Sequence, residues 1–364
     1  MKTKLMIDRY TKWWKNLEAS KQASKQASLD NCTFVKTILM LLVIIYHSCV
    51  FWNGNWFTVQ NVKIKAPLLA VFAQWLNSFH VYGFTLISGY LFHFLKNEEG
   101  RYSQYIPFVL NKIRRLLIPY VFIACCWIVP ISVKLCNYSL DDVIDRYIWC
   151  TNPSQLWFLW MLFDVFIIIW PLNKFVKNDL LAIIISAISW GIGFVGGAYF
   201  KNLFCIWTAL NFLPYFILGM KLREKNTHIL YRIPSWVYIV LQLGLFFLEK
   251  IVLRQDCVSA KVIGLGNEYA LHIVGALMSF FVLQSIATNI KWKDNILFSF
   301  FSTKTMPVYL FHQQIIYFTI IWLNGKVNPY INATINFLVS VTISLVISGI
   351  FMKFKWTRRL IGEK

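Results

Sequence analysis

The sequence predicts an all-α fold, a polytopic membrane helix bundle of about ten transmembrane helices. Three observations predict it. First, 58% of the 364 residues are hydrophobic and only 14% are charged, whereas soluble domains are about half apolar and about a quarter charged. Second, apolar runs long enough to cross a bilayer recur from residue 33 to residue 352. Third, the lysines and arginines gather in short clusters between these runs, as they do in membrane proteins.

The individual spans follow from the length of each apolar run, since about twenty residues cross a bilayer as a helix. The second run is long enough to be tilted or broken, and a short turn at 200–202 predicts that the fifth and sixth form a hairpin. The ten predicted spans are 33–52, 67–95, 116–135, 155–173, 180–199, 203–220, 233–251, 267–288, 306–323 and 332–352.

The positive charges predict the orientation. Ten spans place both termini on one side, and with both termini inside, 26 of the 36 lysines and arginines fall on inner segments. This bias predicts cytoplasmic N- and C-termini and a multi-pass location in the inner (cytoplasmic) membrane. The predicted divisions are a basic cytoplasmic tail (1–30), a transmembrane domain (31–355) and a second cytoplasmic tail (356–364).

The composition also excludes several functions. The net charge of +20 could suggest nucleic-acid binding, but no basic face with interleaved aromatic residues is present, so we expect the lipid bilayer as partner and no nucleic acid. The eight cysteines and six histidines show no metal-ligand spacing, and we expect no metal.

Two ionisable residues of the first span are the main candidates for function, because charged or titratable groups at bilayer depth are costly. Lys36 and His47 are eleven residues apart, which is about three helical turns and about 16 Å along the axis, so both emerge on one face. An extended ligand could place an anionic group at Lys36 and its reactive end at His47. Alternatively, Lys36 reaches lipid headgroups and His47 hydrogen-bonds a neighbouring helix.

Other ionisable residues are weaker candidates. Asp164 lies in the fourth span at a depth near that of His47, where a carboxylate could orient the imidazole or could make a polar contact between helices. Glu268, at the outer end of the eighth span, is a candidate for contact with an acceptor. Counting residues from the membrane surface places His80 and His312 nearer the inner side.

An ordered set of motifs follows Lys36 and His47 along the chain: FHVYGFTLISGYLF (79–92), KIRRLLIPY (112–120), QLWFLWML (155–162), YFILGM (215–220) and TMPVYLFH (305–312). With these motifs the chain resembles the acyltransferase-3 family of integral membrane O-acyltransferases over roughly residues 30–353. We expect a stand-alone member without a fused SGNH-type domain.

The resemblance implies a membrane O-acyltransferase, most simply an O-acetyltransferase, that moves an acyl group from cytosolic acetyl-CoA to a hydroxyl of an extracytoplasmic or lipid-linked carbohydrate. His47 takes the place of the family's essential histidine, and Lys36 stands where many members have arginine. It further implies donor contacts from Lys112, Arg114, Arg115, Ser88, Tyr309 and His312, and a substrate contact from Trp157, which could instead be an interfacial aromatic residue.

Several alternatives remain at this point. His47 could act as a general base or form a transient acyl-histidine. The protein could instead be a glycan transporter or flippase, a polymerase of surface polysaccharide assembly, or a structural membrane protein. A homo-oligomer is compatible with the sequence.

Overall fold

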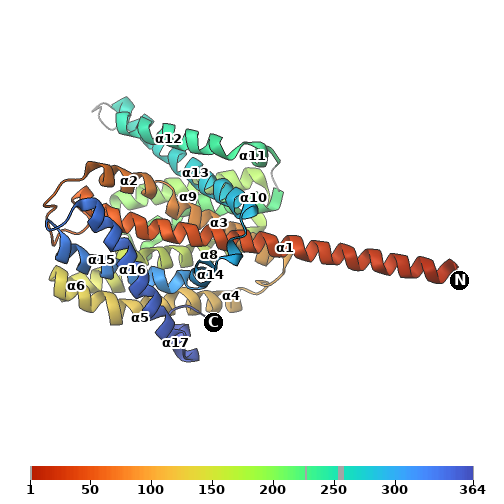
Figure 1. Ribbon diagram of the computed structural model, residues 1–364. Coiled ribbons are helices and arrows are strands. Elements are labelled where there is room, and N and C mark those ends of the chain that lie inside the picture. Colours follow the sequence, from red (N-terminus) through yellow and green to blue (C-terminus); the bar gives the residue numbers. More distant parts are fainter. Residues whose placement is uncertain (1, 226–227, 253–257, 364) are drawn as a thin grey trace.

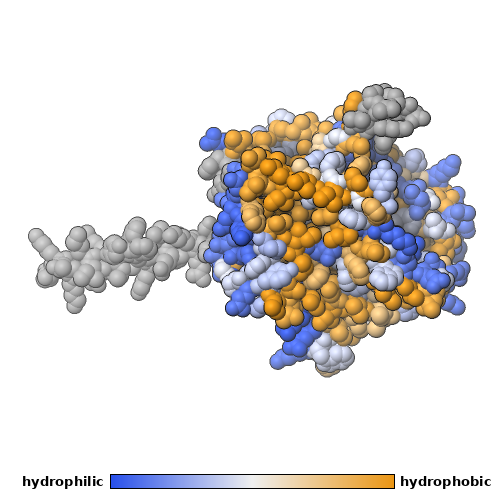
Figure 2. Space-filling model, turned by 180° about the vertical axis from the view of Figure 1, so that it is seen from behind, coloured by the Kyte–Doolittle hydropathy of each residue, from blue (hydrophilic) through white to orange (hydrophobic). Residues whose placement is uncertain are grey.

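The structure is a computed structural model that describes residues 2–225, 228–252 and 258–363. Within these ranges every regular element is a helix and no strand occurs. Seven helical segments in the described ranges are long and apolar enough to cross a membrane. Figure 2 shows a broad apolar surface that is flanked by hydrophilic patches. The prediction of a polytopic helical membrane protein is therefore confirmed, while the count of ten spans and the side of the termini stay predictions.

The chain forms helices along almost its whole described length. In chain order they are α1 (Lys2–Cys49), α2 (Pro67–Asn77), α3 (His80–His93), α4 (Tyr105–Lys112), α5 (Ile118–Ile123), α6 (Val129–Cys136), α7 (Leu140–Val143), α8 (Trp157–Val176), α9 (Asp179–Tyr199), α10 (Ile206–Lys225), α11 (His228–Arg232), α12 (Ser235–Val252), α13 (Val258–Asn289), α14 (Ile296–Ser302), α15 (Thr305–Leu323), α16 (Pro329–Phe351) and α17 (Lys355–Leu360).

Helix α1 runs through the middle of the bundle. Its C-terminal half contacts α2, α3, α13, α15 and α16, and Leu39 and Ile44 on this half are fully buried. Its N-terminal half projects from the bundle as a continuous helix (Figure 1). Because α1 is unbroken from Lys2 to Cys49, the predicted boundary at residue 30 falls inside one helix, and Lys36 and His47 keep the spacing that helical geometry gives them.

The second predicted span is broken, as its length suggested. Helix α2 ends at Asn77 and α3 begins at His80. The intervening residues are held by other helices: the amide nitrogen of Gln242 donates to the Ser78 hydroxyl at 2.8 Å, and a Cβ on Gly275 would lie 2.6 Å from Phe79. The break therefore lies inside the protein, where its polar groups find partners.

Helices α3 and α10 approach unusually closely because each contributes a glycine to the crossing. A Cβ on Gly89 would lie 1.9 Å from the carbonyl oxygen of Phe216, and a Cβ on Gly219 would lie 1.9 Å from that of Leu86. Small residues let helix backbones touch in membranes, and the two glycines explain why this pair packs so tightly.

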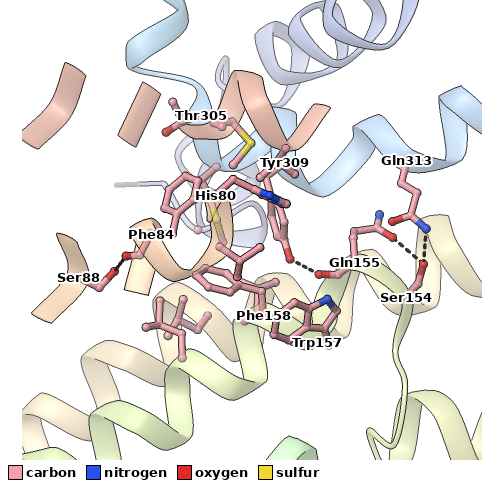
Figure 3. Close-up of a pocket in the computed structure, with 18 of the residues that line it drawn as sticks. His80, Phe84, Ser88, Ser154, Gln155, Trp157, Phe158, Thr305, Tyr309 and Gln313 are labelled. Carbon is pink, nitrogen blue, oxygen red and sulfur yellow. Dashed lines mark hydrogen bonds between the residues drawn. The ribbon is translucent and has the colours of Figure 1, made fainter. Parts of the chain in front are cut away.

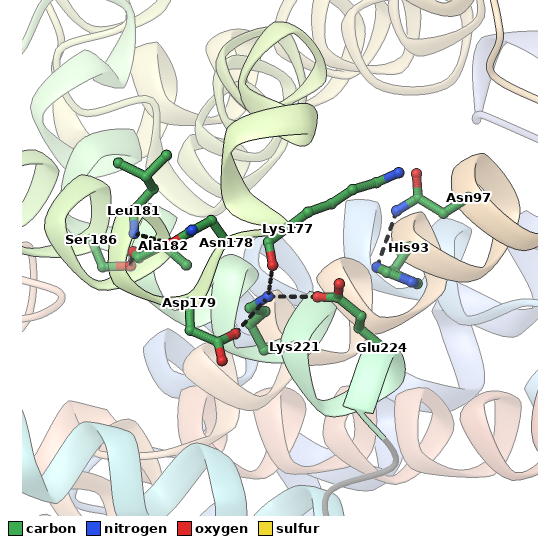
Figure 4. A network of polar contacts seen from close by, with 10 residues as sticks. All are labelled: His93, Asn97, Lys177, Asn178, Asp179, Leu181, Ala182, Ser186, Lys221 and Glu224. Carbon is green, nitrogen blue, oxygen red and sulfur yellow. Dashed lines mark hydrogen bonds and ion pairs between the residues drawn. The ribbon is translucent and has the colours of Figure 1, made fainter.

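The predicted hairpin of the fifth and sixth spans is formed by α9 and α10. Glycine again allows the contact, since a Cβ on Gly196 would lie 2.3 Å from the indole of Trp207. At the other end of the hairpin the Lys221 ammonium donates to the Lys177 carbonyl at 2.8 Å and pairs with Asp179 and Glu224 at 2.9 and 2.6 Å (Figure 4). This network ties α8, α9 and α10 together.

Helix α15 lies within the bundle. Of its 19 residues 13 are buried, and its polar residues His312, Gln313 and Gln314 are at most 3% exposed. Polar side chains at this depth require partners from neighbouring segments, and the partners of these three residues define the candidate site.

Candidate functional site

A cavity of about 690 Å³ joins the two residues that the first span places on one face. Both Lys36 and His47 line it, together with side chains from α3, α8 and α15. The two side chains therefore share one internal space, as the helical spacing predicted.

One end of this cavity carries a cluster of positive charge. Lys36, Lys112 and Arg115 line it, and among the described residues none of the three makes an ion pair. The Glu363 carboxyl lies near this cluster: burial raises its pKa, and the positive charge of Arg115 opposes that rise. Three cations without an ion pair gather here, so this end of the cavity is suited to an anionic ligand.

Lys112 is the most enclosed of these cations, at 8% exposed. Its ammonium lies 3.4 Å from the centre of the Phe166 ring and 5.1 and 5.2 Å from the rings of Tyr102 and Phe108. Three aromatic faces thus hold the charge in position without neutralising it. Arg114, the third member of the predicted basic stretch, is exposed and does not line the cavity.

Further along the cavity lies His47, which forms a pair with His312 in the protein behind it. The Nε2 atom of His312 lies 3.1 Å from Nδ1 of His47. The other ring nitrogen of His312 lies 2.7 Å from the Tyr309 carbonyl oxygen, and Nδ1 of His47 also lies 2.9 Å from the Val43 carbonyl oxygen. His312 is completely buried.

These contacts assign the tautomers of both rings. A carbonyl oxygen only accepts, so Nδ1 of His312 carries a hydrogen, and in the neutral ring its Nε2 is an acceptor. Nδ1 of His47 then carries the hydrogen that faces both His312 and Val43. The Nε2 atom of His47 keeps its lone pair, and among the described residues it has no hydrogen-bond partner. His47 is thus arranged as a proton acceptor.

His312 and His80 lie closer to His47 than the count of residues along the chain predicted. His312 contacts His47 directly, and His80 lines the same cavity, with its ring 5.1 Å from that of Tyr46, the neighbour of His47. His80 is the first residue of α3, directly after the break, and its Nδ1 lies 2.5 Å from the Leu76 carbonyl across that break.

The end of the cavity beyond His47 is aromatic and rich in amides. The Trp56 ring lies 5.5 Å from His47 and 5.1 Å from Tyr317. The Gln313 amide donates to the Ser154 hydroxyl at 3.0 Å (Figure 3). Neutral donors and acceptors between aromatic faces suit a polyhydroxylated ligand.

Three further residues that the resemblance implied as donor or substrate contacts lie at the cavity. Ser88, Tyr309 and Trp157 line the cavity. The Ser88 hydroxyl donates to the Phe84 carbonyl at 2.8 Å, and the Tyr309 hydroxyl donates to the Gln155 carbonyl (Figure 3). Tyr309 therefore positions the segment before α8, and its carbonyl fixes the tautomer of His312.

Asp164 and Glu268 do not join the site. The side chain that lies within hydrogen-bond distance of the His47 ring is His312 and not Asp164. Asp164 does not line the cavity, and one of its buried oxygens has no hydrogen-bond partner. Glu268 is exposed on α13 and is likewise not part of the cavity.

A comparison with protein families gives one match that covers nearly the whole chain: the family model for an acyltransferase domain, of the acyltransferase-3 type, matches residues 28–353. The chain belongs to the acyltransferase-3 family. The resemblance inferred from the motifs is thereby confirmed. No curated protein and no solved structure matches the chain.

The acyltransferase-3 domain thus contains one cavity in which three cations, His47 backed by the buried His312, and an amide-lined mouth follow one another. Reasoning from the sequence missed His80, Trp56, Gln313, Tyr317 and the relation of His312 to His47. A usable signal was the run of His312, Gln313 and Gln314 inside an apolar span, because three polar residues there require buried partners.

Proposed function

We propose that this membrane acyltransferase transfers an acetyl group from acetyl-CoA to a hydroxyl of a carbohydrate. The observation that carries the proposal is the single cavity that links the cations Lys36, Lys112 and Arg115 to the unoccupied Nε2 of His47. The family supports acyl transfer in general; the donor, the acceptor and the base are the parts that we propose.

The donor end is supported by charge. The phosphates of CoA are anionic, and Lys36, Lys112 and Arg115 are cations without ion pairs in the described part of the chain. Lysine binds phosphate as a point charge and arginine binds it as a bidentate donor. With its phosphates there, the donor's extended arm runs along the face of α1 toward His47, about three helical turns away.

The reaction that fits this arrangement uses His47 as a general base. The acceptor hydroxyl oxygen attacks the thioester carbonyl carbon, and Nε2 of His47 takes the hydroxyl proton. The carbon–sulfur bond then breaks, and the proton passes from His47 to the CoA sulfur. While His47 is positively charged, its Nδ1–H donates to neutral His312, which stabilises the imidazolium.

The acceptor end is supported by the amide and aromatic side chains beyond His47, including Trp56, Tyr317 and Gln313. Amides bond sugar hydroxyls, and aromatic rings provide apolar faces for the C–H surface of a sugar ring. We propose that donor and acceptor enter from opposite ends of the cavity and meet at His47, which corresponds to the predicted cytoplasmic donor and extracytoplasmic acceptor in the inner membrane. The transporter alternative is less favoured because the family is one of acyltransferases.

The test is the release or transfer of label from [¹⁴C]acetyl-CoA by the purified full-length protein. Removing a general base slows a reaction about 10²–10⁴-fold, so His47→Ala should lose activity on this scale. The matched control is His272→Asn, because His272 stacks on Tyr82 at 4.0 Å and does not line the cavity. Full activity of His47→Ala, or equal loss in both variants, would refute the proposed role of His47.

A further inference from the structure

The mouth of the cavity beyond His47 contains one charged residue that the proposed reaction does not use. Arg146 lines the cavity, and the other lining residues that come from the same segment between α6 and α8 are uncharged: Tyr138, Asn152, Ser154 and Gln155. Its guanidinium carbon lies 4.7 Å from the centre of the Tyr138 ring. The stacked ring holds the side chain in place and leaves its donors free.

Among the described residues Arg146 makes no ion pair and no hydrogen bond, although Asp142 and Asp145 lie within reach of its electric field. The two carboxylates closest to it in sequence are engaged elsewhere. Asp142 accepts from the backbone and hydroxyl of Ser139 at 2.9 and 2.7 Å. Asp145 pairs with Lys201 at 3.1 Å and accepts from the Thr151 hydroxyl at 2.9 Å. The planar set of donors on Arg146 is therefore free to bind a ligand at this mouth.

This placement separates two groups of positive charge in one cavity. Lys36, Lys112 and Arg115 lie at one end, and Arg146 lies on the segment that follows α6, beside Tyr138. His47 lies between the two groups, with Trp56 and Tyr317 on the side away from Lys36. A donor that binds at Lys36, Lys112 and Arg115 and places its thioester at His47 does not extend to Arg146. Arg146 is then available to bind the acceptor.

We infer that the acceptor is an anionic carbohydrate, and that Arg146 binds its carboxylate or phosphate group while the hydroxyl to be acylated lies at His47. The inference rests on the proposed function and names the class of its acceptor. Guanidinium groups bind carboxylate and phosphate through two parallel hydrogen bonds, so either group satisfies the same fork. A neutral glycan would leave the charge of Arg146 unpaired at the mouth.

The binding test uses the full-length protein and three probes: methyl glucuronoside, glucose 1-phosphate and methyl glucoside. Ligand-observed NMR measures the affinity of each. A charge-assisted contact of this kind should make at least one anionic probe bind about tenfold more tightly than the neutral probe. Preference for the carboxylate probe indicates a uronic-acid-type acceptor, and preference for the phosphate probe indicates a phosphate-bearing one.

Variants then assign the preference to Arg146. The preference should vanish in Arg146→Gln and persist in Lys134→Gln, which removes an exposed cation of α6 that does not line the cavity. Equal binding of all three probes to the wild type, absence of binding by both anionic probes, or a preference that survives in Arg146→Gln would overturn the inference.

The proposed function has a separate readout. His47-dependent release of label from acetyl-CoA into water needs no carbohydrate, so it is measured in the same preparation of wild-type protein and His47→Ala. Loss of that dependence counts against the proposed function. Intact dependence without an anion preference counts against the role of Arg146 alone.

Discussion

The hydrogen bond between His312 and His47 gives the sharpest prediction about the reaction. Replacing His312 by phenylalanine removes the acceptor that faces Nδ1 of His47 at 3.1 Å. The carbonyl of Val43 still holds the hydrogen on Nδ1 at 2.9 Å, so the ground-state tautomer survives. The variant loses the hydrogen bond from His47 to the neutral His312 ring, and this bond becomes stronger when His47 is positively charged.

The size of the effect follows from the type of bond. A hydrogen bond to a charged group contributes about 1.5–3 kcal/mol, and each 1.4 kcal/mol changes a rate about tenfold. The neutral ground state already makes this bond, which contributes about 0.5–1.5 kcal/mol, so only the difference of about 1–1.5 kcal/mol acts on kcat, and we expect His312→Phe to lower kcat for acetyl transfer by about 5- to 10-fold. The affinity for CoA should change little, because His312 lies away from Lys36, Lys112 and Arg115.

The conservative variant His312→Gln distinguishes this role from simple packing, because its amide oxygen can replace the lost acceptor. It should recover most of the rate that His312→Phe loses. The assay is single-turnover transfer from [¹⁴C]acetyl-CoA together with calorimetric titration of CoA. Wild-type kcat in His312→Phe, or equal loss of kcat in both variants, would refute the reasoning.

Two further predictions concern donor binding and packing. Lys112→Met should weaken CoA binding about tenfold by calorimetry, because the Lys112 charge is enclosed by rings and has no ion pair. The control Lys96→Met removes a lysine over the Trp170 ring outside the cavity and should leave CoA binding unchanged. Equal affinities in both variants would contradict the donor assignment. Gly89→Ala should destabilise the protein by about 1–3 kcal/mol, because its Cβ would overlap the Phe216 carbonyl, and Gly244→Ala, with open space around its Cβ, is the control. A melting temperature of Gly89→Ala equal to that of the control would show that the α3–α10 contact is looser than described.

The sequence predicted the all-helical membrane fold and the shared face of Lys36 and His47, because both depend on local quantities. The length of an apolar run predicts a span. A separation of eleven residues within one helix sets the angle between the directions of the two side chains. The hairpin of α9 and α10 and the break in 67–95 were predictable for the same reason, since turn length and run length are read directly from the chain.

The partners of His47 could not be predicted in this way. His312 is 265 residues away in the sequence, and its depth depends on how α15 sits in the bundle, which no local pattern specifies. Asp164 was a candidate because carboxylates commonly orient histidines, but only the packing of α8 decides which way its side chain points. The role of Arg146 depends similarly on the engagement of Asp142 and Asp145 elsewhere.

The most direct test of the central claim is an experimental structure of the protein with a non-hydrolysable acetyl-CoA analogue. The claim is that one donor spans the cavity along α1. The predicted result is density for the phosphates beside Lys36, Lys112 and Arg115, with the acetyl carbonyl carbon next to Nε2 of His47. Density for the nucleotide at the Arg146 end, or outside the cavity, would contradict the account.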